Sequence, residues 1–302
     1  MSTIVRTVVA WDDTAPGHAA LRWALDRDPR GRIELVAVLD ESRMPPGVTV
    51  DDALTAAAGE ALERAVSEAR SAAPDASVSS RVIVGDRMDV LREQTAPDTL
   101  LVIGTHDRGG FLHRFGWSLG ARLAGVARGP LAVVPEAAPA LPPGRIVVGI
   151  DGSVGASRAL LVAAREASRR HQTLHVVHAW EPPVLPDDSF ALDAEAVAAL
   201  RAEHRRIVDD AVATARSEHP GLDVRGELRS GEAARVLVES HPEAGLVVVG
   251  SRGRSALRRL MLGSVAHDVV LGAFRPVLVV PAEHLAGEQS PPEVRAAEPA
   301  TV

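Results

Sequence analysis

Short apolar runs alternate with longer segments of helical periodicity along most of the 302-residue chain. In the second half, the runs that predict β-strands are residues 146–151, 174–180, 224–228, 246–250 and 277–280. Apolar positions three and four residues apart predict the intervening helices, at residues 155–170, 193–217, 232–240 and 264–273. The strands are rich in Val, Ile and Leu with little polar alternation, which indicates a parallel sheet covered on both faces. The predicted fold is an open α/β sandwich of five parallel strands.

The same series of segments occurs twice in the chain. RTVVAWDDT from Arg6 corresponds to RIVVGIDGS from Arg145, and GPLAVVP from Gly129 corresponds to RPVLVVP from Arg275. The strand motif that ends in Gly104 likewise corresponds to the one that ends in Gly250. Because the order of the motifs is identical, the sequence predicts two homologous domains in tandem.

The repeat also predicts where the domains end and how they associate. The predicted segments are a first domain at residues 1–136, a Pro-rich linker at 137–144, a second domain at 145–283 and a disordered tail at 284–302. Each domain closes with an apolar strand followed by proline, at 131–134 and 277–280. An unpaired apolar edge strand favours association, so we expect the two domains to pair through these strands. The sequence leaves open whether two chains also associate as a homodimer.

Composition and charge remove several classes of function. Cysteine is absent, which leaves no disulfide framework and no thiolate chemistry. The net charge of -7 argues against a nucleic-acid partner, because binding to phosphate backbones needs a basic face. No signal peptide or membrane span is visible, and we expect a soluble, cytoplasmic protein without a membrane partner. Lysine is also absent, which excludes a P-loop lysine.

Glycines cluster after the fourth predicted strand of the second domain. Gly250, Gly253 and Gly263, followed by Ser264, form the pattern G-x2-G-x9-G-S at the start of a predicted helix. Glycine lets a backbone approach a ligand closely, and a helix N-terminus presents N–H groups and a positive dipole to an anion. The Ser264 hydroxyl can cap this helix or bind a phosphate oxygen. The segment therefore predicts a phosphate-binding loop, with Arg252 beside it as a positive charge.

Together with VVGIDGS before it and RPVLVVP after it, this pattern resembles the universal stress protein family over nearly the whole chain, as two tandem copies. The resemblance implies Rossmann-like five-stranded sheets of strand order 3-2-1-4-5 and an adenine nucleotide ligand, ATP, alone or with Mg²⁺. It also implies that Asp151 contacts the nucleoside and that the backbone of Ala179 reads adenine. The complete predicted site comprises Gly149, Ile150, Asp151, Ala179, Gly250, Arg252, Gly253, Gly263, Ser264 and Val265.

The first domain departs from the glycine pattern at two of its three glycines, where Asp107 and Trp117 stand instead. A carboxylate near a triphosphate costs on the order of 1 to 4 kcal/mol at surface-like dielectric, and an indole fills space that a backbone would need. We therefore expect the principal ATP site in the second domain and a degenerate or altered site in the first. The residues expected to form that weaker site are Asp12, Val38, Gly104 and Ser118.

Other arrangements of polar residues give no comparable signal. His171, His175 and His178 have helical metal-ligand spacing, but the last two fall in a predicted strand, where an odd separation points them to opposite faces. We therefore predict no metal site there. Ser264 and His267 lie three residues apart on one helix, yet a capping role suits the serine better than nucleophilic chemistry. No catalytic residue is predicted.

Three functions remain consistent with the sequence. The favoured one is a nucleotide-dependent stress or dormancy regulator, in which bound ATP changes a surface that an unidentified protein partner recognises. The second is a slow ATPase or nucleotide-processing enzyme of the same fold, for which no general base is evident. The third is a scaffold that keeps the fold for pairing alone. Cyclic AMP in place of ATP is also open.

Overall fold

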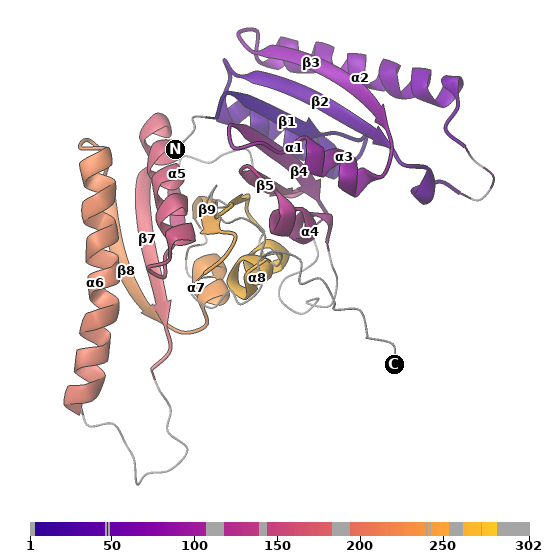
Figure 1. The fold of residues 1–302 in the computed structure, drawn as a ribbon. Coiled ribbons are helices and arrows are strands. Elements are labelled where there is room, and N and C mark those ends of the chain that lie inside the picture. Colours follow the sequence, from indigo (N-terminus) through magenta and orange to yellow (C-terminus); the bar gives the residue numbers. More distant parts are fainter. Residues whose placement is uncertain are drawn as a thin grey trace, which may run out of the picture.

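The structure is a computed structural model that describes residues 4–45, 47, 49–106, 118–138, 144–182, 194–239, 241, 243–253, 262–272 and 274–282. Ten strands form one mixed sheet, in the order β3-β2-β1-β4-β5-β10-β9-β6-β7-β8 (Figure 1). The strands of the first domain are β1 (Arg6–Ala10), β2 (Arg32–Leu39), β3 (Ser77–Val84), β4 (Thr99–Thr105) and β5 (Leu131–Pro135). Those of the second are β6 (Arg145–Gly149), β7 (Thr173–Trp180), β8 (Val224–Ser230), β9 (Ala244–Gly250) and β10 (Val277–Val280). Each half has the order 3-2-1-4-5, which confirms the predicted α/β fold.

The two domains join through their last strands. β5 and β10 pair antiparallel, with Val277 opposite Val133, and the other strand pairs in each domain are parallel. The backbone groups of both apolar edges are thereby satisfied, as expected for edge strands that would otherwise invite association. The predicted pairing of the domains within the chain is confirmed.

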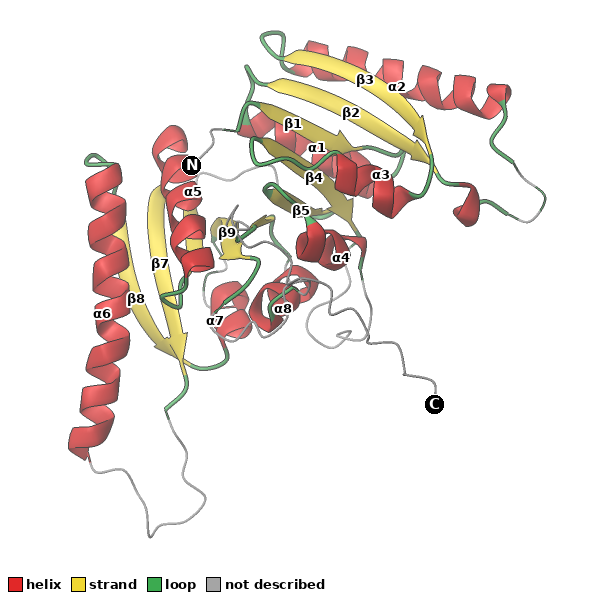
Figure 2. Cartoon of the chain, viewed as in Figure 1, coloured by secondary structure: helices red, strands yellow, loops and turns green. Residues whose placement is uncertain are grey.

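Helices cover both faces of the joined sheet (Figure 2). The longer helices, α1 (Ala15–Arg27), α2 (Asp52–Ala72), α5 (Val154–Arg170) and α6 (Ala194–Glu218), lie on one face, whose core cluster contains residues from all four. The shorter helices, α3 (Arg87–Glu93), α4 (Leu119–Val126), α7 (Ala233–Glu239) and α8 (Ser264–Gly272), lie on the other. Within the described residues, none of these helices is both long and apolar enough to cross a membrane.

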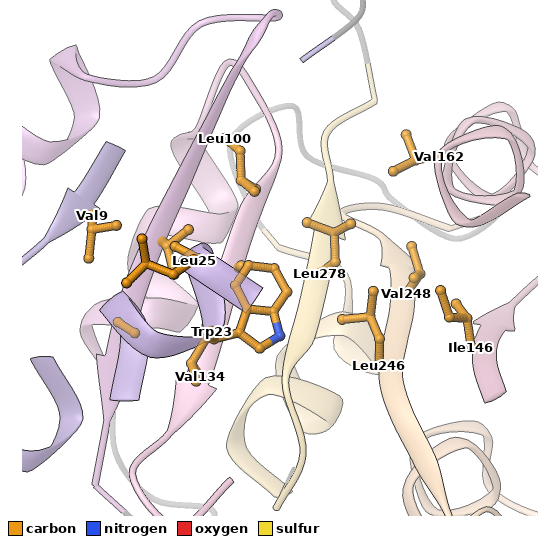
Figure 3. Packing of buried hydrophobic residues seen from close by; sticks show 14 of the residues in the cluster. Val9, Trp23, Leu25, Leu100, Val134, Ile146, Val162, Leu246, Val248 and Leu278 are labelled. Carbon is orange, nitrogen blue, oxygen red and sulfur yellow. The ribbon is translucent and has the colours of Figure 1, made fainter. Parts of the chain in front are cut away.

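Each core cluster continues from one domain into the other. On the face of the long helices, Trp23 of α1 and Leu278 of β10 belong to the same cluster of buried residues, which Figure 3 shows in part. Both side chains are almost fully buried. Because burial of apolar surface is the main favourable contribution to folding, this continuity couples the stability of the two domains.

A buried ionic network also joins the domains. Arg27 of α1 donates a hydrogen bond to Glu166 of α5, and both side chains are nearly inaccessible to solvent. Arg169 and Arg170 contact the same carboxylate at 2.9 and 3.3 Å. Burial alone would raise the pKa of Glu166, but the three guanidinium groups outweigh it and hold that pKa below its ordinary value. Burial lowers the pKa of Arg170 to about 10. One carboxylate therefore compensates several buried cations.

The predicted bounds of the helices and strands in the second domain agree with the observed ones to within two residues at each end. The difference with most consequence is that β6 ends at Gly149, so Asp151 lies in the turn after the strand. Gly152 adopts a φ of 79° in that turn, a conformation that favours glycine. Ser153 then caps α5, and its hydroxyl accepts a hydrogen bond from the Ala156 amide at 3.1 Å.

Candidate functional site

The carboxylate of Asp151 is held at the carboxyl end of β6 by the turn that starts α5. The Ser153 amide donates to Asp151 Oδ1 at 2.9 Å, and the side chain is half-buried. In doubly wound sheets, ligands bind beyond the carboxyl ends of the strands where the strand order reverses. Strands β7 and β9 flank β6 on its two sides, so Asp151 lies at that point of reversal.

The backbone at Gly253 lies directly beside the side chain of Asp151. A Cβ atom added to Gly253 would lie 2.6 Å from Asp151 Oδ2, so the backbone after β9 passes directly beside the carboxylate. The Arg252 carbonyl packs equally closely on the start of α5, where a Cβ on Gly155 would lie 2.6 Å from it. Residues that are about 100 positions apart in the sequence thus lie side by side at the carboxyl end of the sheet.

Gly250 has a packing role that differs from the predicted one. A Cβ added to Gly250 would lie 2.8 Å from the Gly155 carbonyl carbon and 3.1 Å from the Ala156 amide. Gly104 of the first domain is constrained in the same way by the Pro16 backbone of α1. At this position glycine lets the helix approach the strand, as in other doubly wound folds, and a ligand is not needed to explain it.

Ser251 organises the loop and was missed in the sequence analysis. It is buried, its amide donates to the Val280 carbonyl at 2.8 Å, and its carbonyl accepts from the Gly263 amide at 2.8 Å. Its hydroxyl accepts from the Ala282 amide at 3.2 Å. A serine beside two motif glycines looks like another polar loop residue in the sequence. Its contacts hold together the end of β9, the start of α8 and the residues after β10.

Gly263 occupies the N-cap position of α8. The helix begins at Ser264, and the His267 amide donates to the Gly263 carbonyl at 2.9 Å. The suggested capping role of Ser264 is therefore wrong, because the serine is the first helical residue and lies after the cap. Glycine brings no side-chain acceptor to the first-turn amides. Ser264 and Val265 are exposed at this helix start.

The remaining predicted residues line the strand ends. The Ile150 amide donates to the Val177 carbonyl at 2.9 Å, and the Ile150 carbonyl contacts His178 Nδ1 at 2.7 Å. Ala179 is half-buried near the end of β7. A Cβ on Gly149 would lie 2.7 Å from a Leu237 methyl group, so this glycine serves helix packing. The backbone of Ile150 is thus held against β7.

The residues of the first domain that correspond to this site have different contacts. Arg87 Nη2 lies 3.4 Å from Asp12 Oδ2. Ser118 caps α4 with its hydroxyl, which accepts from the Ala121 amide at 3.1 Å. Both polar groups therefore have partners within the domain. Val38 is half-buried, as Ala179 is. Asp107 and Trp117 lie outside the described residues.

The histidines of β7 face opposite sides of the sheet, as their spacing predicts. His178 contacts His204 of α6, with 2.8 Å between Nε2 and Nδ1. His175 instead lies beside His241, on the side of α7. Because the two side chains lie on opposite faces of the sheet, they cannot bind one metal ion together.

Comparison with known proteins agrees with this architecture. The sequence pattern of the universal stress protein family matches residues 4–135 and 143–281, and the chain belongs to that family. It is 30% identical to universal stress protein Rv2005c of Mycobacterium tuberculosis over 289 residues, which cover 90% of this chain and 95% of the relative.

Solved structures show the same fold. A universal stress protein from Archaeoglobus fulgidus superposes with a TM-score of 0.67 at 19% identity and covers 92% of this chain and 98% of its own. A second protein from Archaeoglobus fulgidus, solved in complex with dAMP, is 31% identical over 45% of this chain and 97% of its own, with a TM-score of 0.34.

Proposed function

We propose that the protein binds ATP in its second domain and acts as a nucleotide-dependent regulator. The observation that carries this proposal is the convergence of Asp151, Gly253 and the glycine-capped N-terminus of α8 at the point where the strand order reverses. A carboxylate acceptor on one side and helix N–H groups on the other match the two ends of a nucleoside phosphate. No group in this arrangement is assigned a catalytic role.

Each proposed contact follows from a property of the residue. Asp151 accepts a hydrogen bond from the nucleoside, and the backbone of Ala179 contacts the base. The phosphates lie over Gly263, Ser264 and Val265, where the first-turn amides and the helix dipole favour negative charge. Arg252 adds a guanidinium that can bind phosphate. The other residues of the proposed site, Gly149, Ile150, Gly250 and Gly253, shape the backbone around the ligand.

The first domain is proposed to bind nucleotide weakly or not at all. The ion pair between Arg87 and Asp12 occupies the carboxylate that would meet a nucleoside, and the hydroxyl of Ser118 is used by its own helix. The proposed division of the chain stays at residues 1–136 and 145–283, with 137–144 as linker. A regulator with one nucleotide site presents a single ligand-dependent surface to a partner protein, beside Gly253 and the start of α8.

Two measurements test the proposed function. Equilibrium dialysis against ATP is expected to give saturable binding, and a turnover assay on the same sample is expected to give no product above background. Release of ADP at a steady rate would favour a slow ATPase, and absence of binding would favour a scaffold. Mass spectrometry of nucleotide extracted from freshly purified protein then distinguishes ATP from cyclic AMP as the ligand held in cells.

Two substitutions of Asp151 distinguish its proposed contact with the ligand from its hydrogen bond within the turn. Asp151→Asn keeps an acceptor for the Ser153 amide and replaces the other oxygen by an amide group. Both Asp151→Asn and Asp151→Ala should weaken ATP and adenosine alike, by about 1 to 3 kcal/mol, because a buried donor on the ligand loses its acceptor. Calorimetry with both ligands measures this loss. Unchanged affinity in the asparagine variant would remove Asp151 from the site.

A further inference from the structure

Two histidines and a glutamate from three separate segments converge on the α7 side of the second domain. His175 comes from β7, Glu227 from β8 and His241 from the connection between α7 and β9. One potential ligand atom from each residue lies within 4.8 Å of the other two. The cluster lies near the start of β9, whereas the proposed nucleotide loop follows the end of that strand after Gly250. The two sites are therefore independent.

The cluster contains buried polar atoms whose hydrogen-bonding capacity is not used. His241 is 3% exposed and His175 is 8% exposed. Among the described residues, neither His241 Nε2 nor Glu227 Oε2 has a hydrogen-bond partner, although the two atoms are 3.4 Å apart. Leaving buried polar groups unpaired costs about 1 to 3 kcal/mol each, and native structures rarely keep such groups without a reason. A bound cation would satisfy both atoms.

The surroundings of the two imidazoles favour their neutral form. Burial lowers the pKa of His175, and Arg145 lowers it further. Burial also lowers the pKa of His241, despite the opposing effect of Glu227. Neutral imidazole is the form that ligates metal ions. Arg229 donates to Glu227 Oε1 at 2.9 Å, which orients Oε2 toward the histidines as an outer-sphere partner would.

The other nearby cations have carboxylate partners of their own. Arg145 lies 2.9 Å from Glu243, and Arg225 lies 3.2 Å from Asp223. These ion pairs reduce the positive potential that would repel a divalent ion. The cluster thus keeps one carboxylate oxygen and two imidazoles directed toward one another.

The first domain shows what the same positions do without a metal. The register of β2 with β3 and of β7 with β8 places Glu34 at the position of His175 and Arg81 at that of Glu227. There, Arg81 and Glu34 form an ion pair at 3.1 Å. The first domain therefore satisfies these positions with opposite charges, whereas the second domain has ligand atoms at both and adds His241.

We propose that His175, Glu227 and His241 bind one Zn²⁺ ion. Two imidazole nitrogens and one carboxylate oxygen are a donor set found in zinc sites, with a fourth position for water. Nitrogen donors disfavour Mg²⁺ and Ca²⁺, which take oxygen ligands. Zinc bonds of about 2.0 to 2.2 Å place tetrahedral ligand atoms about 3.3 Å apart. The three ligand atoms already lie within 4.8 Å of one another, and side-chain rotation would bring them to that spacing.

Zinc affinity is measured by competition with a chromophoric chelator, on untagged full-length protein first treated with EDTA. We expect one Zn²⁺ per chain, and a more than tenfold loss of affinity for His241→Gln and for Glu227→Gln, since even outer-sphere changes cost about 10- to 100-fold. The matched control is His204→Gln on the opposite face, which should bind zinc as the unaltered protein does.

A second variant, called the transplant variant, distinguishes loss of zinc binding from loss of folding. His175→Glu combined with Glu227→Arg builds the ion pair of the first domain into the second, so it should fold and yet bind no zinc. Thermal unfolding with and without Zn²⁺ should show stabilisation of the unaltered protein and of His204→Gln, and none of the transplant variant. Absence of stoichiometric zinc binding, or equal binding by the transplant variant, would overturn the proposal.

Discussion

Gly263→Trp is expected to abolish most ATP binding while the second domain stays folded. The glycine lies at the N-cap of α8, and an added Cβ would be 3.4 Å from Arg252 Cα and from the Ser251 carbonyl, which is ordinary contact. The backbone therefore tolerates a side chain, but an indole covers the helix N-terminus where we propose that phosphate binds. We expect calorimetry to show at least about a 100-fold loss of affinity, equal to about 2.7 kcal/mol.

Gly263→Ala is the matched control for this substitution. The methyl group fits the same space, so ATP affinity should change by less than about threefold, with a small loss of stability because alanine is a poorer N-cap than glycine. Circular dichroism should give the same helix content for both variants. Binding that survives Gly263→Trp would show that the phosphates lie elsewhere.

Glu166→Ala should lower the free energy of unfolding by about 3 to 5 kcal/mol, because removing one partner of a buried ion pair leaves an uncompensated buried charge. Arg27 and Arg170 are both buried around this carboxylate. Denaturation by urea measures the loss. The control Arg169→Gln removes a partner that is 35% exposed, so it should cost less than about 1 kcal/mol.

The same network makes a prediction about pH. The pKa of Glu166 is lowered in the folded protein. The contribution of Glu166 to the free energy of unfolding is therefore fully present above its pKa in the unfolded chain, near 4.5. It is lost as pH falls through the lowered pKa of the folded protein. The difference in stability between the unaltered protein and Glu166→Ala should therefore be constant from pH 6 down to about pH 5 and decrease in more acidic solution. A difference that decreases between pH 8 and pH 6 would contradict this assignment.

The fold could be predicted from the sequence because each of its elements has a local signal. Continuous apolar runs predicted the buried parallel strands, and the repeat predicted that the domains would pair through β5 and β10. The contact of Glu166 with Arg27 could not be predicted in this way. It depends on how α1 and α5 lie across the joined sheet, which is set by the pairing and twist of distant strands.

The candidate site was predicted in part, and the differences have physical reasons. The motif identified Asp151, Gly253 and Gly263, but the spacing of glycines does not reveal which neighbour each one needs. Gly250 packs on α5, and two of the three hydrogen bonds of Ser251 use backbone groups that any residue type has. The cluster of His175 with Glu227 and His241 was missed for a similar reason, because its members come from three segments without a recurring spacing.

Calorimetric titration of the nucleotide-free full-length protein with ATP tests the central claim most directly, when Asp12→Ala and Asp151→Ala are measured beside it. The two substitutions remove equivalent carboxylates from the two domains. Our account predicts about one ATP per chain in the unaltered protein and in Asp12→Ala, with affinity reduced in Asp151→Ala alone. Two ATP molecules per chain, or a loss of affinity caused by Asp12→Ala instead of Asp151→Ala, would contradict it.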